Sequence, residues 1–174
     1  MSKLVILFTG LSGSGKSSLV SAVASKLNSA CGPVKILDGD VARTTFSRDL
    51  TFSSEDRHEN IRRAAYIASY LSIDSIVLAS FISPYKSQRD YMRSMCDNFA
   101  EIYVSCPIEI CKSRDPKGMY SKLVDGKFNN NPFTGVHNDA PYEPPENPDL
   151  IIYTNTESVD KSAERVINFI EGWL

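Results

Sequence analysis

The residues best suited to chemistry lie near the start of the chain, in the stretch GLSGSGKSS at 10–18. This stretch follows the apolar run LVILFT at 4–9 and fits the pattern G-x-x-x-x-G-K-[ST]. Glycines let backbone N–H groups turn inward around a polyphosphate, and a helix beginning directly afterwards adds its positive end. The spacing places Lys16 at the β and γ phosphates and the Ser17 hydroxyl at Mg²⁺. The pattern predicts a nucleoside triphosphate site, rather than a glycine-rich turn without a ligand, formed by Gly10, Leu11, Ser12, Gly13, Ser14, Gly15, Lys16, Ser17 and Ser18.

Such a phosphate loop serves small-molecule kinases, switch GTPases and motor ATPases, so other residues must decide between them. A GTPase needs an N-K-x-D sequence to read guanine, and this sequence has none. DPKG at 115–118 matches D-x-x-G of a GTPase switch, but it lies far beyond the loop, and we interpret it as a chance match. A motor ATPase usually carries an acid at the end of an apolar strand, whereas SIVLAS at 75–80 ends in Ser80. These observations favour a small-molecule kinase.

The acids instead follow the second apolar run, in KILDGDVAR at 35–43. Asp40, just beyond the predicted strand end, is positioned to take a proton from an acceptor hydroxyl. Asp38 is suited to orienting the water shell of a metal ion. The alternative is that both belong to an Asp-Gly turn joining strand to helix. Arg43 adds a planar fork suited to an anionic acceptor.

A second polar cluster lies in DLTFSSEDRHENIRR at 49–63. Arg57 and Asn60 are three residues apart, so they share one face of a predicted helix. Phe52, just before that helix, is either a hydrophobic staple or one side of a slot for a base. Arg62 and Arg63 follow on the same helix. They are either exposed to solvent or paired with Glu59 and Glu55.

The elements that position these residues alternate along the chain. Short apolar runs predict strands at 4–9, 34–38, 75–80, 101–105 and 150–154, and helical periodicity predicts helices at 16–28, 54–71, 84–97 and 158–174. SSED is a capping-box pattern for the second helix, and Pro84 suits the first turn of the third. The alternation predicts an α/β fold, a five-stranded parallel sheet with helices on both faces, whose ligands bind at the carboxyl ends of the strands.

One segment departs from this alternation. Residues 114–148 are rich in Pro, Asn and Gly and show little periodicity. So long an irregular stretch is usually a functional lid or disordered, and its aromatic and charged residues favour a lid.

Composition limits the classes of protein that remain. The chain has 174 residues, of which 42% are hydrophobic and 23% charged, as expected for a single globular domain spanning 1–174. A net charge of −2 argues against a nucleic-acid partner but allows a small anionic ligand. The apolar run at 4–9 is too short for a membrane span and leads into the phosphate loop, so we expect no membrane association. The cysteines lack CxxC or metal-ligand spacing, which predicts reduced, mostly buried thiols in a cytoplasmic protein; they are Cys31, Cys96, Cys106 and Cys111.

Together these motifs resemble the adenylylsulfate kinase family of P-loop small-molecule kinases. The matching stretches follow the family's order and cover nearly the whole chain: GLSGSGKSS, LDGDVAR, RDLTFSSEDRHENIRR, FISPY, RDPKGMY, FTG and PYEPPENPDLII. The resemblance implies a three-layer P-loop kinase fold. It also implies ATP- and Mg²⁺-dependent phosphorylation of the 3′-hydroxyl of adenosine 5′-phosphosulfate to 3′-phosphoadenylylsulfate in sulfate assimilation. Members of the family often form homodimers.

The resemblance also implies roles for individual residues. Lys16 would act on the donor phosphates, covered by Lys117 from the lid, and Asp40 would be the base or orienting group at the acceptor ribose. Ser83 matches a serine assigned in the family as a phosphorylated intermediate, although no neighbouring base in the sequence activates it and direct in-line transfer needs no covalent stage. Arg43, Arg57 and Asn60 would hold the phosphosulfate end of the acceptor. Phe52 and Phe133 would lie on either side of its adenine. Ile82 and Ser83 would make further contacts with the acceptor. The donor adenine would lie near Arg114 and Thr154.

Three departures from the family pattern bear on the acceptor. Val41 stands where the family usually has Asn, the connection before IVLAS is one residue shorter than usual, and the lid is longer on both sides of FTG. They leave open a sibling kinase that phosphorylates another nucleotide, for example cytidine diphosphoramidate in capsule biosynthesis. A third alternative is a nucleotide-binding regulatory protein without catalysis.

Overall fold

The structure is a computed structural model that describes residues 3–27, 32–124, 133–137 and 140–173. Five parallel strands form one sheet in the order β2-β3-β1-β4-β5. The strands are β1 (Val5–Thr9), β2 (Val34–Asp38), β3 (Ile76–Ser80), β4 (Phe99–Ser105) and β5 (Leu150–Tyr153). The helices are α1 (Lys16–Leu27), α2 (Gly39–Thr44), α3 (Ser54–Leu71), α4 (Lys86–Met95), α5 (Ile108–Arg114), α6 (Met119–Val124) and α7 (Val159–Glu171).

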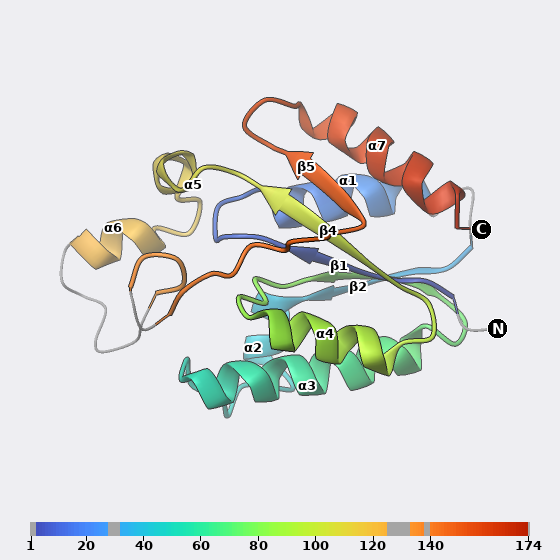
Figure 1. The fold of residues 1–174 in the computed structure, drawn as a ribbon, viewed down its shortest axis with the longest axis horizontal. Coiled ribbons are helices and arrows are strands. Elements are labelled where there is room, and N and C mark those ends of the chain that lie inside the picture. The colour runs from blue at the N-terminus through green and yellow to red at the C-terminus, as the bar shows by residue number, and fades with distance from the viewer. Residues whose placement is uncertain (1–2, 28–31, 125–132, 138–139, 174) are drawn as a thin grey trace.

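Helices cover both faces of this sheet, which confirms the predicted three-layer α/β fold. Helices α1 and α7 lie on one face, and α3 and α4 lie on the other (Figure 1). Helices α5 and α6 lie at the end toward which the strands point. The ligand-binding edge predicted from the parallel topology therefore lies next to the segment predicted as a lid.

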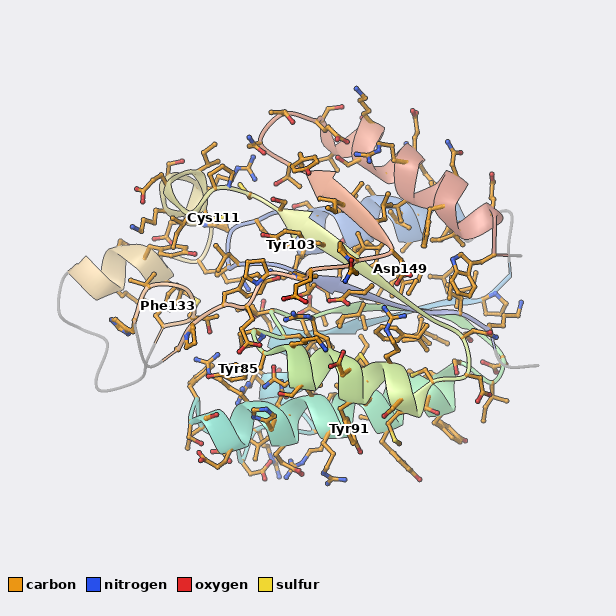
Figure 2. The ribbon with its side chains drawn as sticks, in the orientation of Figure 1. Tyr85, Tyr91, Tyr103, Cys111, Phe133 and Asp149 are labelled. Atoms are coloured by element: carbon orange, nitrogen blue, oxygen red, sulfur yellow. The ribbon has the colours of Figure 1, made fainter. Side chains whose placement is uncertain are left out.

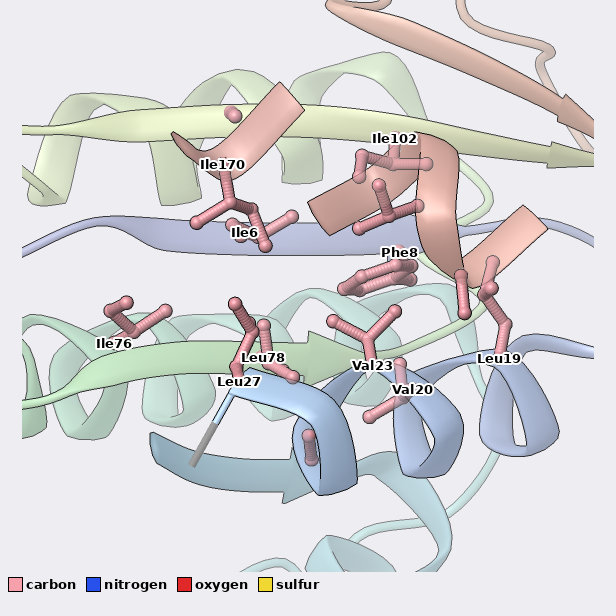
Figure 3. Packing of buried hydrophobic residues seen from close by; sticks show 14 of the residues in the cluster. Ile6, Phe8, Leu19, Val20, Val23, Leu27, Ile76, Leu78, Ile102 and Ile170 are labelled. Atoms are coloured by element: carbon pink, nitrogen blue, oxygen red, sulfur yellow. The ribbon is translucent and has the colours of Figure 1, made fainter. Parts of the chain in front are cut away.

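The central strand β1 shows why the sheet is buried on both faces. All of its residues are buried, and their side chains alternate between two apolar clusters. Ile6 and Phe8 pack against α1 and α7 (Figure 3), whereas Val5 and Leu7 pack toward α3. A strand covered on both sides reads as a continuous apolar run, which is why the sequence predicted it so clearly.

The helix boundaries match the predicted ranges closely, with two corrections at helix starts. Helix α3 begins after Ser53, whose Oγ accepts from the backbone N–H of Asp56 at 3.1 Å. The Asp56 carboxylate accepts from Thr51, so the described bonds form an N-cap and not the predicted capping box. Helix α4 begins at Lys86, so the prediction that Pro84 lies in its first turn is wrong; Pro84 precedes the N-cap residue.

Three short helices were missed, and one lies in the predicted irregular segment. Helices α2, α5 and α6 have six or seven residues each, too few to display a helical period in sequence. Helix α6 lies within 114–148, and its first turn is fixed by the Asp115 carboxylate, which accepts from the N–H groups of Met119, Tyr120 and Ser121. Residues 125–132 and 138–139 of that segment lie outside the described residues.

Two further predictions concern cysteines and membranes. Cys96, Cys106 and Cys111 are free and buried, as expected, while Cys31 lies outside the described residues. Among the helices in the described ranges, none is long and apolar enough to cross a membrane.

Candidate active site

A cavity of about 780 Å³ lies where the carboxyl ends of the strands meet, within the usual size range of ligand sites, about 300–1,000 Å³. Its walls come from the segments that follow β1, β2, β3 and β5, together with α3 and the lid. Among the predicted site residues, only Gly10, Leu11 and Ser14 are absent from the lining. Those that line it are Ser12, Gly13, Gly15, Lys16, Ser17, Ser18, Asp38, Asp40, Arg43, Phe52, Arg57, Asn60, Ile82, Ser83, Arg114, Lys117, Phe133 and Thr154.

The phosphate loop turns tightly between β1 and α1, as the glycine spacing predicted. Gly13 has φ +78°, and a Cβ atom there would come within 2.8 Å of the Cys111 carbonyl oxygen. The Lys16 ammonium folds back over the loop and donates to the carbonyl oxygens of Gly10, at 2.8 Å, and Leu11, at 2.7 Å. Gly10 and Leu11 therefore contribute to the site through their backbone rather than by lining it.

The Lys16 side chain is buried at the junction of the loop and α1. Burial, and after it the neighbouring charge of Lys117, lower the pKa of Lys16 to about 8. A polyanion placed against the loop would favour the charged ammonium, because an opposite charge stabilises it where water cannot. The site thus has two cations close enough to repel each other and suited to sharing an anion.

The two aspartates of LDGDVAR have different contacts. Asp38 caps α2, because its Oδ1 accepts from the backbone N–H groups of Asp40, at 2.8 Å, and Val41, at 3.4 Å. Its other oxygen lies 3.4 Å from the Ser17 hydroxyl, so it also reaches the phosphate loop. The Asp40 carboxylate forms an ion pair with Lys117 from the loop between α5 and α6. The Asp-Gly turn weighed as an alternative is therefore present, and it brings both acids to the cavity.

Residues of α2 and α3 form a cationic wall of the cavity. The guanidinium carbons of Arg43 and Arg57 lie 4.6 and 5.6 Å from the centroid of the Phe52 ring. Burial lowers the pKa of both arginines, and the charge of Arg57 adds to the effect at Arg43. One buried cation, Arg57, and one partly buried cation, Arg43, lie beside an exposed aromatic ring, and this favours a ligand that combines an anionic group with a flat ring.

Three buried polar atoms on this cavity have no hydrogen-bond partner among the described residues. They are Asn60 Oδ1 on α3, Ser83 Oγ after β3, and Gln88 Nε2 on α4. Orphaned buried polar groups are costly unless a ligand satisfies them. Asn60 and Ser83 were predicted to be site residues. Gln88 was not, and the only signal available was its position three residues after Tyr85, the N-cap residue of α4.

The predicted lid contacts the site at several of its described residues. Besides the Lys117–Asp40 pair, the Tyr120 hydroxyl donates to the Ser12 carbonyl at 2.9 Å. The Thr134 hydroxyl accepts from Arg57 at 2.6 Å, which sequence reasoning missed because the two residues are far apart in the chain. Phe133 is buried, and the centroid of its ring lies 4.7 Å from that of Tyr120. It lies at the same end of the molecule as Cys111 (Figure 2).

Arg114 and Thr154 lie together at the other end of the phosphate loop. Arg114 donates to the Thr154 hydroxyl and carbonyl at 3.2 and 2.7 Å, and the Thr154 hydroxyl donates to the Ser14 carbonyl at 2.6 Å. This chain links α5 and the end of β5 to the loop. Glu157, Val159 and Ser162 line the same region and were not predicted.

Comparisons with known proteins agree with this architecture. A family model described as adenylylsulphate kinase matches residues 2–153. The adenylyl-sulfate kinase of Halothermothrix orenii is 44% identical over 169 residues, covering 97% of this chain and 89% of the relative. The adenylyl-sulfate kinase of Oceanobacillus iheyensis is 46% identical over 171 residues, covering 96% and 83%.

A solved structure gives the same result. The Mycobacterium tuberculosis APS kinase CysC, in complex with AMPPNP and APS, superposes with a TM-score of 0.91 and 38% identity, covering 98% of both chains. The family match, the relatives and the shared fold lead to one conclusion: the chain belongs to the adenylylsulphate kinase family.

Proposed function

We propose that this protein is a kinase that transfers the γ-phosphoryl group of ATP to the 3′-hydroxyl of adenosine 5′-phosphosulfate, giving 3′-phosphoadenylylsulfate for sulfate assimilation. The observation that carries the proposal is that one cavity is lined both by a phosphate loop and by a cationic, aromatic wall. The related M. tuberculosis kinase was solved with an ATP analogue and APS bound together, which supports the same pair of substrates here.

On the donor side, the residues of this chain bind and hold the phosphates. Backbone N–H groups of the loop and the N-terminus of α1 supply fixed positive dipoles at no cost in reorganisation. Lys16 would exchange its two carbonyl contacts for phosphate oxygens, which would stabilise its positive charge. Arg114 and Thr154, fastened to the loop, would bound the donor adenine.

On the acceptor side, Asp40 would orient the ribose hydroxyl and take its proton as the phosphoryl group arrives. Its present partner, Lys117, would move from the carboxylate to the donor phosphates, so that nucleotide binding releases the base. Arg43, Arg57 and Asn60 would hold the phosphosulfate end, and Phe52 and Phe133 would enclose the adenine. Lid contacts that exclude water would limit wasteful hydrolysis of ATP.

Ser83 is proposed to contact the acceptor without becoming phosphorylated. Its hydroxyl has no hydrogen-bond partner among the described residues, so no described side chain is in position to activate it as a nucleophile. Direct in-line transfer from donor to acceptor needs no such intermediate.

The residues at the phosphate loop fit a magnesium ion. The Ser17 hydroxyl and the Asp38 carboxylate lie 3.4 Å apart beside the loop, and hard oxygen ligands of this kind are those that Mg²⁺ prefers. Ser17 would bind the ion directly and Asp38 would hold its water shell. When bound, Mg²⁺ neutralises charge on the donor phosphates.

The sibling kinase acting on a cytidine nucleotide is the competing proposal. Val41, the departure that raised it, is 58% exposed and does not line the cavity, so the change leaves the described acceptor walls intact. A regulatory protein without catalysis is disfavoured because Lys16, Ser17 and Asp40 are all present at the cavity. We propose a single domain from the length and composition, a cytoplasmic location from the cysteine spacing, and a homodimer from the family resemblance. Light scattering of the purified chain would test the dimer.

A coupled assay of ADP release tests the function directly. The protein is incubated with MgATP and, in separate reactions, with adenosine 5′-phosphosulfate, cytidine diphosphoramidate or no acceptor, and the product is identified by mass. We expect acceptor-dependent ADP release with adenosine 5′-phosphosulfate. Turnover with the cytidine compound alone would establish the sibling kinase instead, and ATP binding without turnover on either acceptor would favour the regulatory protein.

A further inference from the structure

The loop that follows β3, residues 82–84, carries an unusual backbone conformation at the cavity wall. Ser83 has φ +43°, in the left-handed region that residues other than glycine rarely adopt. Its side chain is buried, lines the cavity, and has no hydrogen-bond partner for its hydroxyl among the described residues. A conformation of this kind persists only when the surrounding structure fixes it.

The surrounding structure holds all three carbonyl groups of this loop, each from a different element. The Ile82 carbonyl accepts from the Thr9 hydroxyl at the end of β1, at 2.6 Å. The Pro84 carbonyl accepts from the backbone N–H of Glu143, at 2.8 Å. The carbonyl of Ser83 itself accepts from the Arg89 guanidinium on α4, at 2.8 Å, and this bond is buried. Arg89 therefore holds the left-handed residue directly.

Arg89 is in turn fixed by a carboxylate on the neighbouring strand. Its side chain is 3% exposed, and its Nε lies 2.7 Å from Oε1 of Glu101 on β4. The backbone N–H of Glu101 donates to Asp149, which lies beside β4 (Figure 2). Arg93, one turn further along α4, pairs with Asp149 at 2.9 Å and lies 3.7 Å from Glu101. The network ties α4 and β4 to the loop through one guanidinium, which donates to the Ser83 carbonyl while its charge pairs with Glu101.

We propose that Arg89, oriented by Glu101, is a positioning residue that holds Ser83 in its left-handed conformation and so places Ser83 against the acceptor nucleotide. The inference rests on the proposed function for the identity of the acceptor. Arg89 does not line the cavity, so it acts through Ser83 and not by contact with substrate.

The alternative is an ion pair that only stabilises the fold, and paired lysine substitutions separate the two. Arg89→Lys keeps the charge beside Glu101, so no buried carboxylate is left unpaired, but an ammonium cannot hold Glu101 and the Ser83 carbonyl in the same fixed geometry. Arg93→Lys is the control, because it alters the same carboxylate network without touching the loop. For each variant we measure the Tm, the KM for each substrate, and the amide hydrogen exchange of residues 80–86 in the ligand-free protein.

For Arg89→Lys we expect the acceptor KM to rise about tenfold, because losing one charge-assisted hydrogen bond weakens binding by about that factor. The KM for ATP should be unchanged. Exchange in the peptide 80–86 should be faster than in the unsubstituted protein, and Arg93→Lys should change neither quantity. If Arg89→Lys does not fold, Glu101→Gln, which keeps the volume of the side chain, should shift both quantities in the same direction by less.

An acceptor KM and an exchange rate that match those of Arg93→Lys would overturn the inference, even if the Tm falls. Lack of turnover by the unsubstituted protein with adenosine 5′-phosphosulfate would instead contradict the proposed function. The exchange comparison needs no turnover, so it would then still decide whether Arg89 holds the loop.

Discussion

Asp40 carries the chemistry proposed for the acceptor hydroxyl, and a single substitution separates that role from nucleotide binding. Asp40→Asn keeps the size of the side chain but cannot take a proton, so transfer should fall by about 10²- to 10⁴-fold. ATP binding, measured by calorimetry, should be retained because the phosphate loop is untouched. Asp90→Asn is the control, since Asp90 is an exposed carboxylate paired with Lys86 outside the cavity. Unchanged turnover in Asp40→Asn would remove Asp40 from the mechanism.

Gly13 illustrates a residue whose role is purely conformational. Gly13→Ala forces a side chain into the left-handed region and brings its Cβ within 2.8 Å of the Cys111 carbonyl. The conformational term alone should cost about 1–2 kcal/mol, and the collision should displace the loop from α5. We expect a lower Tm and a weaker affinity for ATP in calorimetry. Gly172→Ala is the control, because that glycine ends α7 with φ −70° and a Cβ atom there would make only ordinary contacts, the nearest at 3.4 Å from the Phe169 carbonyl oxygen. Both measurements should be unaffected.

At this scale, the sequence predicted residues that belong to local patterns and missed those defined by distant contacts. Asp38, Asp40, Arg57 and Asn60 were found because strand ends and helix faces follow from spacing. The partner of Arg57, Thr134, is 77 residues away, and no local pattern links the two. Arg89 escaped notice for the same reason, because its importance comes from a carbonyl in a preceding loop and a carboxylate on another strand.

Among the elements, α3 is fastened to the segment before it by a charge network that responds to pH. Glu59 accepts from Arg62 and Arg63 at 2.6 and 2.8 Å, and Arg63 also binds Asp49. The sequence therefore predicted the pairs with Glu59 correctly, but the described partner of Arg63 besides Glu59 is Asp49 and not Glu55. These arginines, Arg62 first, lower the pKa of Glu59 from 4.5 to about 2.

The sign of the resulting pH effect follows from linkage. Because the pKa is lower in the folded state, the stabilisation is complete above pH 4.5 and is lost as the pH falls toward 2. In Glu59→Gln this stabilisation is missing, so the Tm difference from the unsubstituted protein should be largest above pH 4.5 and shrink as the pH approaches 2. Thermal unfolding followed by circular dichroism across this range gives the measurement. A difference that stays constant or widens in acid would contradict it.

Element length decided which helices and strands were predictable. The long helices α1, α3 and α7 repeat apolar residues over three turns or more, and the central strands β1 and β3 are apolar up to their last residue. Helices α2 and α6 are held by side-chain caps rather than by a long buried stripe. Asp38 and Asp115 act in this way, each accepting from N–H groups at the start of a short helix. Asp38 also lines the cavity, so one residue of the site builds one of its smallest elements.

Across the whole molecule, the site depends on a sheet whose two faces are packed independently. One apolar cluster joins β1 to α1 and α7, and the other joins it to α3 and α4. The phosphate loop extends directly from β1 at the centre of both, so it is anchored by the best-packed part of the chain. A nucleotide bound there should stabilise the entire fold, since it binds the folded state and not the unfolded chain.

At about a hundredfold excess over its Kd, a magnesium-bound, non-hydrolysable ATP analogue should add about 2.7 kcal/mol, or about 5–10 °C in Tm for a domain of this size. Lys16→Met should lose most of this shift while starting at a similar or higher Tm, because burial already lowers the pKa of Lys16 and an apolar side chain suits the position. Lys112→Met, an exposed change on α5, should retain the full shift. An equal shift in all three proteins would mean that the analogue binds away from the phosphate loop.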